Sequence, residues 1–202
     1  MNIICSDLEG VFIPEIWINV AEKTGIEELK LTTRDITDYD ELMKKRLSVL
    51  DKHKIKLNDI TEVIKTIDPL EGAAEALTWI RERTQIVLLS DTFEEFVTPL
   101  MKKLGYPVVL CHSLSIDADG RITDYHLRQQ NQKKHGVKAF HSLKYKVTAF
   151  GDSYNDTAML KEADHGFFFN PPENVAKEFP EFPVVKNYEE LKSMLSSLGC
   201  TR

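Results

Sequence analysis

Short apolar runs alternate with helical patterns along most of the 202-residue chain, and this alternation limits the folds that the sequence can adopt. The runs with the length and composition of buried strands are residues 3–5, 86–89, 108–110, 147–150, 166–169 and 184–185. Helical periodicity predicts helices between most of them, over residues 73–83, 93–104, 133–142, 157–163 and 188–198. Strands that alternate with helices are typical of an α/β fold. We therefore predict a doubly wound (Rossmann-like) parallel sheet.

Two segments depart from this alternation. In residues 113–127, two runs of alternating apolar and polar residues flank Asp119 and Gly120, which predicts a β-hairpin on the flank of the sheet. From residue 26 to residue 68 the chain has neither glycine nor proline, and its pattern is helical. We therefore expect a helical cap over residues 14–70, inserted after the first strand of a catalytic core that comprises residues 1–13 and 71–202. A cap at this place can close over the site as a lid.

Composition and charge argue against several classes of partner. A net charge of −6 argues against binding of nucleic acid, which needs a basic surface. No apolar segment approaches the length of a membrane span, and the first expected strand begins too near the N-terminus for a cleaved signal peptide to precede it. We therefore expect a cytoplasmic protein that acts on small molecules. A homodimer through the exposed sheet edge or the cap is compatible with the sequence.

Two carboxylates, Asp7 and Glu9, follow the first expected strand, and Gly10 then allows the backbone to turn. In open α/β sheets ligands bind beyond the carboxyl ends of the strands, so this pair lies at the predicted binding edge. One carboxylate can attack a phosphoryl group while the other handles the proton of the leaving group. We expect the apolar setting at the strand end to raise the pKa of Glu9, as a proton donor requires.

The second polar strand end is formed by Ser90, Asp91 and Thr92. Thr92 and Glu95 fit a capping box at the start of a helix, which would turn Ser90 and free backbone amides toward a phosphate. The simpler alternative is that the segment only starts a helix. A further helix is expected to begin near Lys133, whose ammonium could offset charge on phosphoryl oxygens. Taken alone, a surface lysine is the alternative.

A fourth set of polar residues follows Gly151, which ends another expected strand. Asp152 comes directly after this glycine, and Asp156 lies four residues later. Mg²⁺ prefers one or two carboxylates together with phosphate oxygens and water, and Asp7 and Asp152 could supply that pair. Asp156 would then orient a water molecule or Lys133. The alternative is a Gly-Asp turn that caps the next helix.

Arg46 lies near the middle of an apolar helix face that is formed by Tyr39, Leu42, Met43, Leu47 and Leu50. Burying an unpaired guanidinium is costly, so Arg46 needs an anionic partner. A substrate carboxylate could bind it bidentately. An internal ion pair with Glu15, Glu22 or Asp40 is an equal alternative. Glu15 itself could bind a substrate ammonium, or it could stabilise the first cap helix through the helix dipole.

Together, Asp-Leu-Glu-Gly-Val, Leu-Ser-Asp-Thr, the lysine and Gly-Asp-Ser-Tyr-Asn-Asp resemble the motifs of the haloacid dehalogenase (HAD) superfamily over almost the whole chain. The phosphoserine phosphatase branch fits best, and within it the members that also transfer phosphate from phosphoserine to homoserine. The resemblance implies Mg²⁺ as the cofactor. It implies phosphoserine, homoserine and water as the small-molecule substrates.

The resemblance also implies a role for each matching residue. Asp7 would be the nucleophile that forms an aspartyl-phosphate, and Glu9 would be the acid/base. The metal ligands would be Asp7, the backbone carbonyl of Glu9, and Asp152, with Asp156 behind them. The residues that would bind the substrate come from both the core and the cap: Glu15, Arg46, Ser90, Asp91, Lys133 and Asn155.

Two positions depart from the usual phosphoserine phosphatase motifs, which have Asp in place of Glu9 and Gly in place of Asp91. Both lie beside the reacting groups, so the choice between water and an alcohol acceptor stays open here. The core motifs do not fix the leaving group, which leaves a phosphatase for a sugar or nucleotide phosphate as one alternative. A phospho-accepting signalling domain is another, although such a domain needs neither Glu9 nor a cap.

Overall fold

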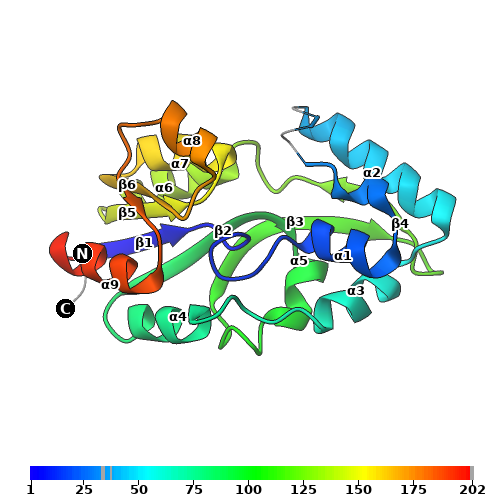
Figure 1. The fold of residues 1–202 in the computed structure, drawn as a ribbon, viewed down its shortest axis with the longest axis horizontal. Coiled ribbons are helices and arrows are strands. Elements are labelled where there is room, and N and C mark those ends of the chain that lie inside the picture. Colours follow the sequence, from blue (N-terminus) through cyan, green and yellow to red (C-terminus); the bar gives the residue numbers. More distant parts are fainter. Residues whose placement is uncertain (33–34, 37, 201–202) are drawn as a thin grey trace.

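The computed structural model describes residues 1–32, 35–36 and 38–200. Within these residues, seven strands form one sheet in the order β4-β3-β2-β1-β5-β6-β7 (Figure 1). The strands are β1 (Asn2–Ser6), β2 (Gln85–Phe93), β3 (Val108–Ile116), β4 (Ile122–His126), β5 (Lys146–Gly151), β6 (His165–Phe169) and β7 (Val184–Val185). All neighbouring strands pair in parallel except β3 and β4. The predicted doubly wound sheet is confirmed.

Helices cover both faces of the parallel part of the sheet. One face carries α4 (Ala73–Arg81) and α9 (Tyr188–Ser197), and the other carries α6 (Gln132–Ser142), α7 (Thr157–Glu162) and α8 (Glu173–Glu178) (Figure 1). Side chains along a strand alternate between faces. Accordingly, Ile4 belongs to one hydrophobic core, while Ile3 and Cys5 belong to the other. Burial on both faces explains why the strands read as continuous apolar runs.

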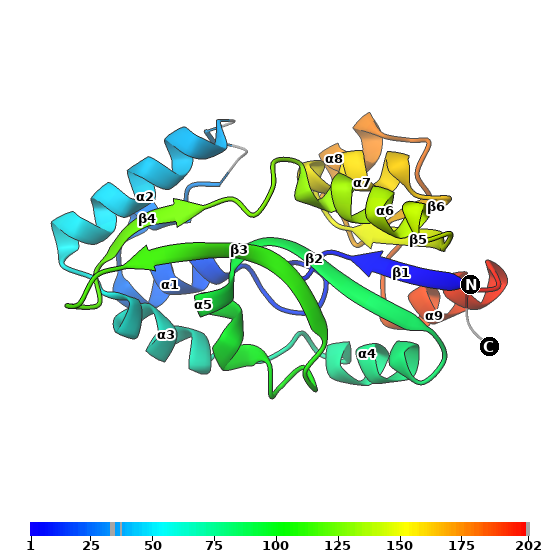
Figure 2. The same ribbon diagram turned by 180° about the vertical axis from the view of Figure 1, so that it is seen from behind.

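The chain between β1 and α4 forms α1 (Ile16–Thr24), a 3₁₀ turn η1 (Glu27–Lys30), α2 (Tyr39–His53) and α3 (Leu57–Lys65). These elements lie at the end of the molecule toward which β1 and β2 run, with α2 on one side of the β3–β4 hairpin and α1 and α3 on the other (Figures 1 and 2). The predicted helical pattern is confirmed for α2 and α3. Residues 33, 34 and 37 of this stretch lie outside the described part of the chain.

The predicted hairpin is present, and its antiparallel pairing runs from Ser113 to His126, within the predicted residues 113–127. β3 continues from its parallel pairing with β2 directly into antiparallel pairing with β4. Gly120, with φ at +80°, donates its N–H to Asp117 and closes the turn. The hairpin holds the inserted helices at several points: the Leu57 N–H donates to the Gly120 carbonyl at 2.9 Å, and the Tyr125 hydroxyl donates to Asp40 at 2.5 Å.

The segment after Ser90 differs from the prediction. β2 continues through Thr92 to Phe93, and α5 (Glu94–Val97) begins with Phe93 at its N-cap and without a side-chain capping bond. The predicted capping box is therefore wrong, because the Glu95 carboxylate instead accepts the Leu114 N–H at 3.1 Å. In place of one helix over 93–104, α5 is followed by a 3₁₀ turn, η2 (Thr98–Leu100), which contains a proline. No helix among the described residues is long and apolar enough to span a membrane.

Candidate active site

Side chains from three parts of the chain meet at the carboxyl edge of the parallel strands. Asp7 follows β1, Asp152 follows β5, and Lys133 lies in the first turn of α6. The Lys133 ammonium is buried and lies 2.9 Å from Asp7 Oδ2 and 2.8 Å from Asp156 Oδ1. The structure thus brings together the carboxylates and the lysine that the sequence placed at this edge.

The buried cluster contains more negative than positive charge. Burial and the neighbouring Asp156 carboxylate raise the pKa of Asp7, while Lys133 opposes this effect. Although burial alone would lower the pKa of Lys133, the carboxylates of Asp156, Asp7 and Asp91 raise it well above its usual range. Lys133 therefore stays charged, and an additional cation beside Asp7 would favour the ionised carboxylate that a nucleophile requires.

The residues present fit a divalent cation. Carboxylate oxygens of Asp7, Asp152 and Asp156 lie within 4.8 Å of one another, and all three residues are buried. The Asp156 oxygens already accept the N–H groups of Asp152 and Ser153, each at 3.0 Å, and the Lys133 ammonium. Asp156 therefore orients its neighbours, and Asp7 and Asp152 are the better candidate ligands.

Two glycines make this crowding of carboxylates sterically feasible. Gly10 has a φ of +75°, and a Cβ atom on it would collide with the Asp152 carboxylate. A Cβ atom on Gly151 would collide with the Asp156 side chain. The backbone after β1 and the backbone at the end of β5 can approach these acids closely only because both residues lack a side chain.

Glu9 lies at the mouth of the cluster, half-buried, and its Oε2 accepts the N–H of Ile16 at 2.8 Å. Desolvation and the nearby Glu15 carboxylate raise the pKa of Glu9 to about 8. The expected rise is confirmed. A carboxylic acid with this pKa is protonated in large part at neutral pH, so Glu9 can donate a proton and can later take one back.

Arg46 lies on α2 with only 7% of its surface exposed. Its guanidinium stacks on Trp17, 4.6 Å from the ring centroid, and donates from Nη2 to the Leu31 carbonyl at 2.8 Å. No carboxylate of the described residues lies within ion-pairing distance, and Asp40 instead pairs with Lys44. The internal ion pair is therefore not formed there. Arg46 Nε is the buried side-chain polar atom without a hydrogen-bond partner among the described residues.

Glu15 is exposed and occupies the N-cap position of α1, where its side chain makes no capping hydrogen bond. The negative charge of Glu15 raises the pKa of Glu9, and it opposes the lowering of the Arg46 pKa by burial. This position is compatible with both predictions for Glu15, the binding of a substrate ammonium and an interaction with the dipole of α1.

Ser90 is buried within β2, three residues before its end, and its hydroxyl accepts the Thr92 N–H at 3.4 Å. The Asp91 carboxylate lies 3.9 Å from the Lys133 ammonium and accepts a hydrogen bond of 3.0 Å from the exposed Asn155 amide. Burial would raise the pKa of Asp91, but Lys133 and further donors outweigh it and hold this pKa below its usual range. The Asp91 carboxylate and the Asn155 amide therefore lie beside the Lys133 cluster.

Three residues that contact this site were not predicted: His112, Gln132 and Tyr39. His112 and Gln132 approach the Asp91 carboxylate, and the Tyr39 hydroxyl donates to the Asp91 carbonyl at 3.1 Å. His112 lies two residues beyond the third predicted strand, at the same carboxyl edge as the other site residues. The strand-end rule applied to that strand would have found it. Gln132 and Tyr39 carry no comparable signal.

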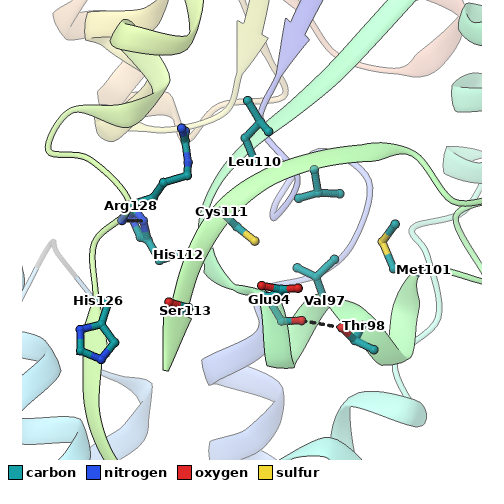
Figure 3. A pocket seen from close by; sticks show the side chains of 11 residues that line it. Glu94, Val97, Thr98, Met101, Leu110, Cys111, His112, Ser113, His126 and Arg128 are labelled. Carbon is teal, nitrogen blue, oxygen red and sulfur yellow. Dashed lines mark hydrogen bonds between the residues drawn. The ribbon is translucent and has the colours of Figure 1, made fainter. Parts of the chain in front are cut away.

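A cavity of about 480 Å³ lies beside this site, between β3 and the α5–η2 segment (Figure 3). His112 and Arg128 form one border of the cavity, and Cys111, Val97 and Met101 form its apolar wall. The catalytic carboxylates do not line it. The cavity meets the site at His112.

Comparison with known proteins agrees with this geometry. The family model described as haloacid dehalogenase-like hydrolase matches residues 3–164. Phosphoserine phosphatase ThrH of Pseudomonas aeruginosa is 61% identical over 192 residues, which cover 95% of this chain and 94% of that protein. A phosphoserine phosphatase of Pseudomonas syringae pv. tomato is 58% identical over 95% of this chain and 81% of its own length.

Solved structures of phosphoserine phosphatases share the fold. An apo form superposes with a TM-score of 0.77 at 25% identity and covers 95% of this chain and 98% of its own. A phospho-aspartyl intermediate analogue gives a TM-score of 0.75 at 23% identity over 97% and 98% of the two chains, which establishes the fold alone. Since the family model spans most of the chain, this protein belongs to the haloacid dehalogenase-like hydrolases.

Proposed function

We propose that the protein is a Mg²⁺-dependent phosphoserine phosphatase that forms an aspartyl-phosphate on Asp7 and can pass the phosphoryl group either to water or to homoserine. The observation that carries the proposal is the buried contact of 2.9 Å between Asp7 and Lys133 at the edge where Asp152 and Ser90 also lie. The names of the two Pseudomonas relatives support phosphoserine as the substrate.

Asp7 and Asp152 would hold the Mg²⁺ ion together with the Glu9 backbone carbonyl. The bound ion would offset negative charge, so that one anion can approach another. The two oxygens of the Asp7 carboxylate have different partners: Oδ1 accepts the Leu8 N–H at 2.7 Å, and Oδ2 faces the Lys133 ammonium. This arrangement suits Asp7 to in-line attack. The Leu8 amide fixes the rotation of the carboxylate.

Glu9 protonates the serine oxygen as it leaves, and the pKa of about 8 provides the protonated form. In the second half of the reaction the ionised Glu9 takes a proton from the attacking water or alcohol. Ser90 and Lys133 hold the phosphoryl oxygens throughout. Lys133 remains charged in this setting, so it can stabilise the transferring group electrostatically.

The rest of the substrate would lie between the core and the inserted helices, with residues 14–70 acting as the cap. The Arg46 Nε–H, which has no partner among the described residues, is a donor for the substrate carboxylate. Glu15 would bind the substrate ammonium. Such a pair recognises an α-amino acid and distinguishes it from a sugar or a nucleotide phosphate.

The acceptor choice follows from Glu9, which is one methylene longer than the aspartate of the usual motif. The longer side chain would place the base farther from Asp7 and would leave room for an alcohol such as homoserine. This part of the proposal rests on residue size and on the resemblance to the enzymes that carry out the transfer.

The proposal is tested by incubating the purified protein with Mg²⁺ and phosphoserine, with and without homoserine, while both free phosphate and phosphohomoserine are measured. Phosphate release without homoserine, with phosphohomoserine formed when it is added, would support the proposal in full. A panel of sugar and nucleotide phosphates serves as the comparison. Faster turnover of a panel member would refute phosphoserine as the substrate, and a single phosphorylation without turnover would indicate a signalling domain.

A further inference from the structure

Lys133 makes two short contacts and one long contact with carboxylates. Asp156 and Asp7 lie at 2.8 and 2.9 Å from its Nζ, whereas Asp91 Oδ2 lies at 3.9 Å, beyond hydrogen-bond distance. An ammonium has three N–H donors. The third donor of Lys133 therefore makes no hydrogen bond with a carboxylate in the described residues, although an ionised one stands next to it.

The Asp91 carboxylate is held by donors from three other elements. His112 Nε2 on β3 lies 3.5 Å from Oδ1, and Gln132 Nε2 on α6 lies 3.2 Å from the same oxygen. The Asn155 amide, after β5, donates to Oδ2 at 3.0 Å. These contacts engage both oxygens of the Asp91 carboxylate.

The two buried donors are themselves fixed by Arg128. The backbone N–H of Arg128 donates to His112 Nδ1 at 3.1 Å, a contact drawn in Figure 3. This bond leaves the imidazole proton on Nε2, where it faces Asp91. The Arg128 guanidinium donates to Gln132 Oε1 at 2.7 Å, so the Gln132 NH₂ group is turned toward Asp91 and toward the Ser90 carbonyl.

We propose that His112 and Gln132 are positioning residues that hold Asp91 away from Lys133 and so keep the third N–H of Lys133 available for a phosphoryl oxygen. A released Asp91 would need to move by only about one ångström to form a hydrogen bond with Lys133. It would then compete with phosphate for the same donor. The inference rests on the proposed function only in taking the anion at Lys133 to be a phosphoryl group.

The test uses two amide substitutions whose side chains differ in length by one methylene group. His112→Asn places an amide near Nδ1 and can still accept the Arg128 N–H, but it loses the donor to Asp91. His112→Gln places its amide near Nε2 and keeps that donor. In the presence of Mg²⁺, binding of inorganic phosphate is measured by calorimetry. We expect His112→Asn to weaken binding about tenfold, the value of one charge-assisted hydrogen bond, and His112→Gln to weaken it by less than about threefold.

Removal of the Asp91 charge supplies the decisive comparison. Because a neutral asparagine amide binds the Lys133 ammonium far more weakly than a carboxylate does, His112→Asn should have little further effect on phosphate affinity in an Asp91→Asn background. A loss that persists in this background would overturn the proposal, as would equal losses for His112→Asn and His112→Gln. Gln132→Met, whose loss should also vanish with Asp91→Asn, is the second variant should His112→Asn fail to fold in a thermal melt.

Phosphate binding also separates this proposal from the proposed function. Tight phosphate binding by the unmodified protein, without turnover of phosphoserine, would refute the substrate and leave the His112 comparison valid. Failure of the unmodified protein to bind phosphate would refute the phosphoryl site and the positioning role together.

Discussion

Replacing Arg46 with methionine should separate substrate recognition from folding. Burial lowers the pKa of Arg46 to about 10 from its ordinary 12.5. Since one pKa unit corresponds to about 1.4 kcal/mol, the folded protein holds this charge at a cost of about 3 kcal/mol. Methionine removes that cost and fills most of the same space beside Trp17.

Arg46→Met also removes two favourable interactions, which together offset most of this gain. The hydrogen bond to the Leu31 carbonyl is worth about 1.5 kcal/mol, and the stacking on Trp17 about 1 kcal/mol. The free energy of unfolding should therefore change by less than about 1 kcal/mol. Breaking a buried ion pair would instead reduce it by about 3–5 kcal/mol. Urea unfolding distinguishes these two outcomes.

The effect on activity should be large and specific to the substrate. Two charge-assisted hydrogen bonds to a carboxylate are worth at least about 3 kcal/mol together, so Arg46→Met should raise KM for phosphoserine about a hundredfold or more. The KM for an aryl phosphate without a carboxylate should change little. Arg46→Lys is the matched control, because it keeps the charge without the planar fork and should recover only part of the loss.

The result that would refute this reasoning is an equal loss of activity on phosphoserine and on the aryl phosphate, together with destabilisation by several kcal/mol. Arg46 would then serve to hold α2 in place, and the carboxylate of the substrate would need another partner.

The remaining predictions concern the reacting groups. Asp7→Asn should abolish phosphate release from any phosphomonoester in a colorimetric assay, and retention of the original rate would remove the nucleophile from the mechanism. Glu9→Gln should slow the turnover of phosphoserine far more than that of an aryl phosphate, whose leaving group needs no proton. For the same reason, single-turnover phosphorylation of the enzyme by phosphoserine should be fast below pH 8 and slow above it, since the pKa of Glu9 is about 8. Phosphorylation by the aryl phosphate should not slow down above pH 8. Glu9→Asp should lower the ratio of phosphohomoserine to free phosphate when homoserine is present. Gly10→Ala should weaken Mg²⁺ binding in calorimetry by at least about tenfold, because its Cβ displaces Asp152 and its φ of +75° disfavours a side chain.

The sheet and its polar strand ends were predictable because they depend on local features. Apolar runs, their spacing and the carboxyl-edge rule were enough to bring Asp7, Ser90, Lys133 and Asp152 to one edge. The wheel of α2 likewise placed Arg46 on a buried face.

Interactions between distant segments were not predictable from these patterns. Glu95 fits a capping box locally, but in the fold it accepts the N–H of Leu114 on the neighbouring strand, and β2 continues to Phe93. The local propensity was overridden by strand pairing. Similarly, the sequence identified Asp91 as unusual, but its environment depends on His112 and Asn155, which come from two other strand ends.

The charges of the cluster also indicate that a cation at this site would favour the binding of an anionic substrate. The carboxylates of Asp7, Asp91 and Asp156 surround the Lys133 ammonium, and the Asp152 carboxylate lies beside those of Asp7 and Asp156. A phosphoryl group that approaches Lys133 adds further negative charge to a buried region, where charges interact strongly. Two of the four acids, Asp91 and Asp156, are held by amide N–H donors, which stabilise their charge but add none of the opposite sign. Asp7 and Asp152 are the proposed ligands of a divalent ion. On the proposed function, a divalent ion held by Asp7 and Asp152 would therefore assist substrate binding as well as the chemical step.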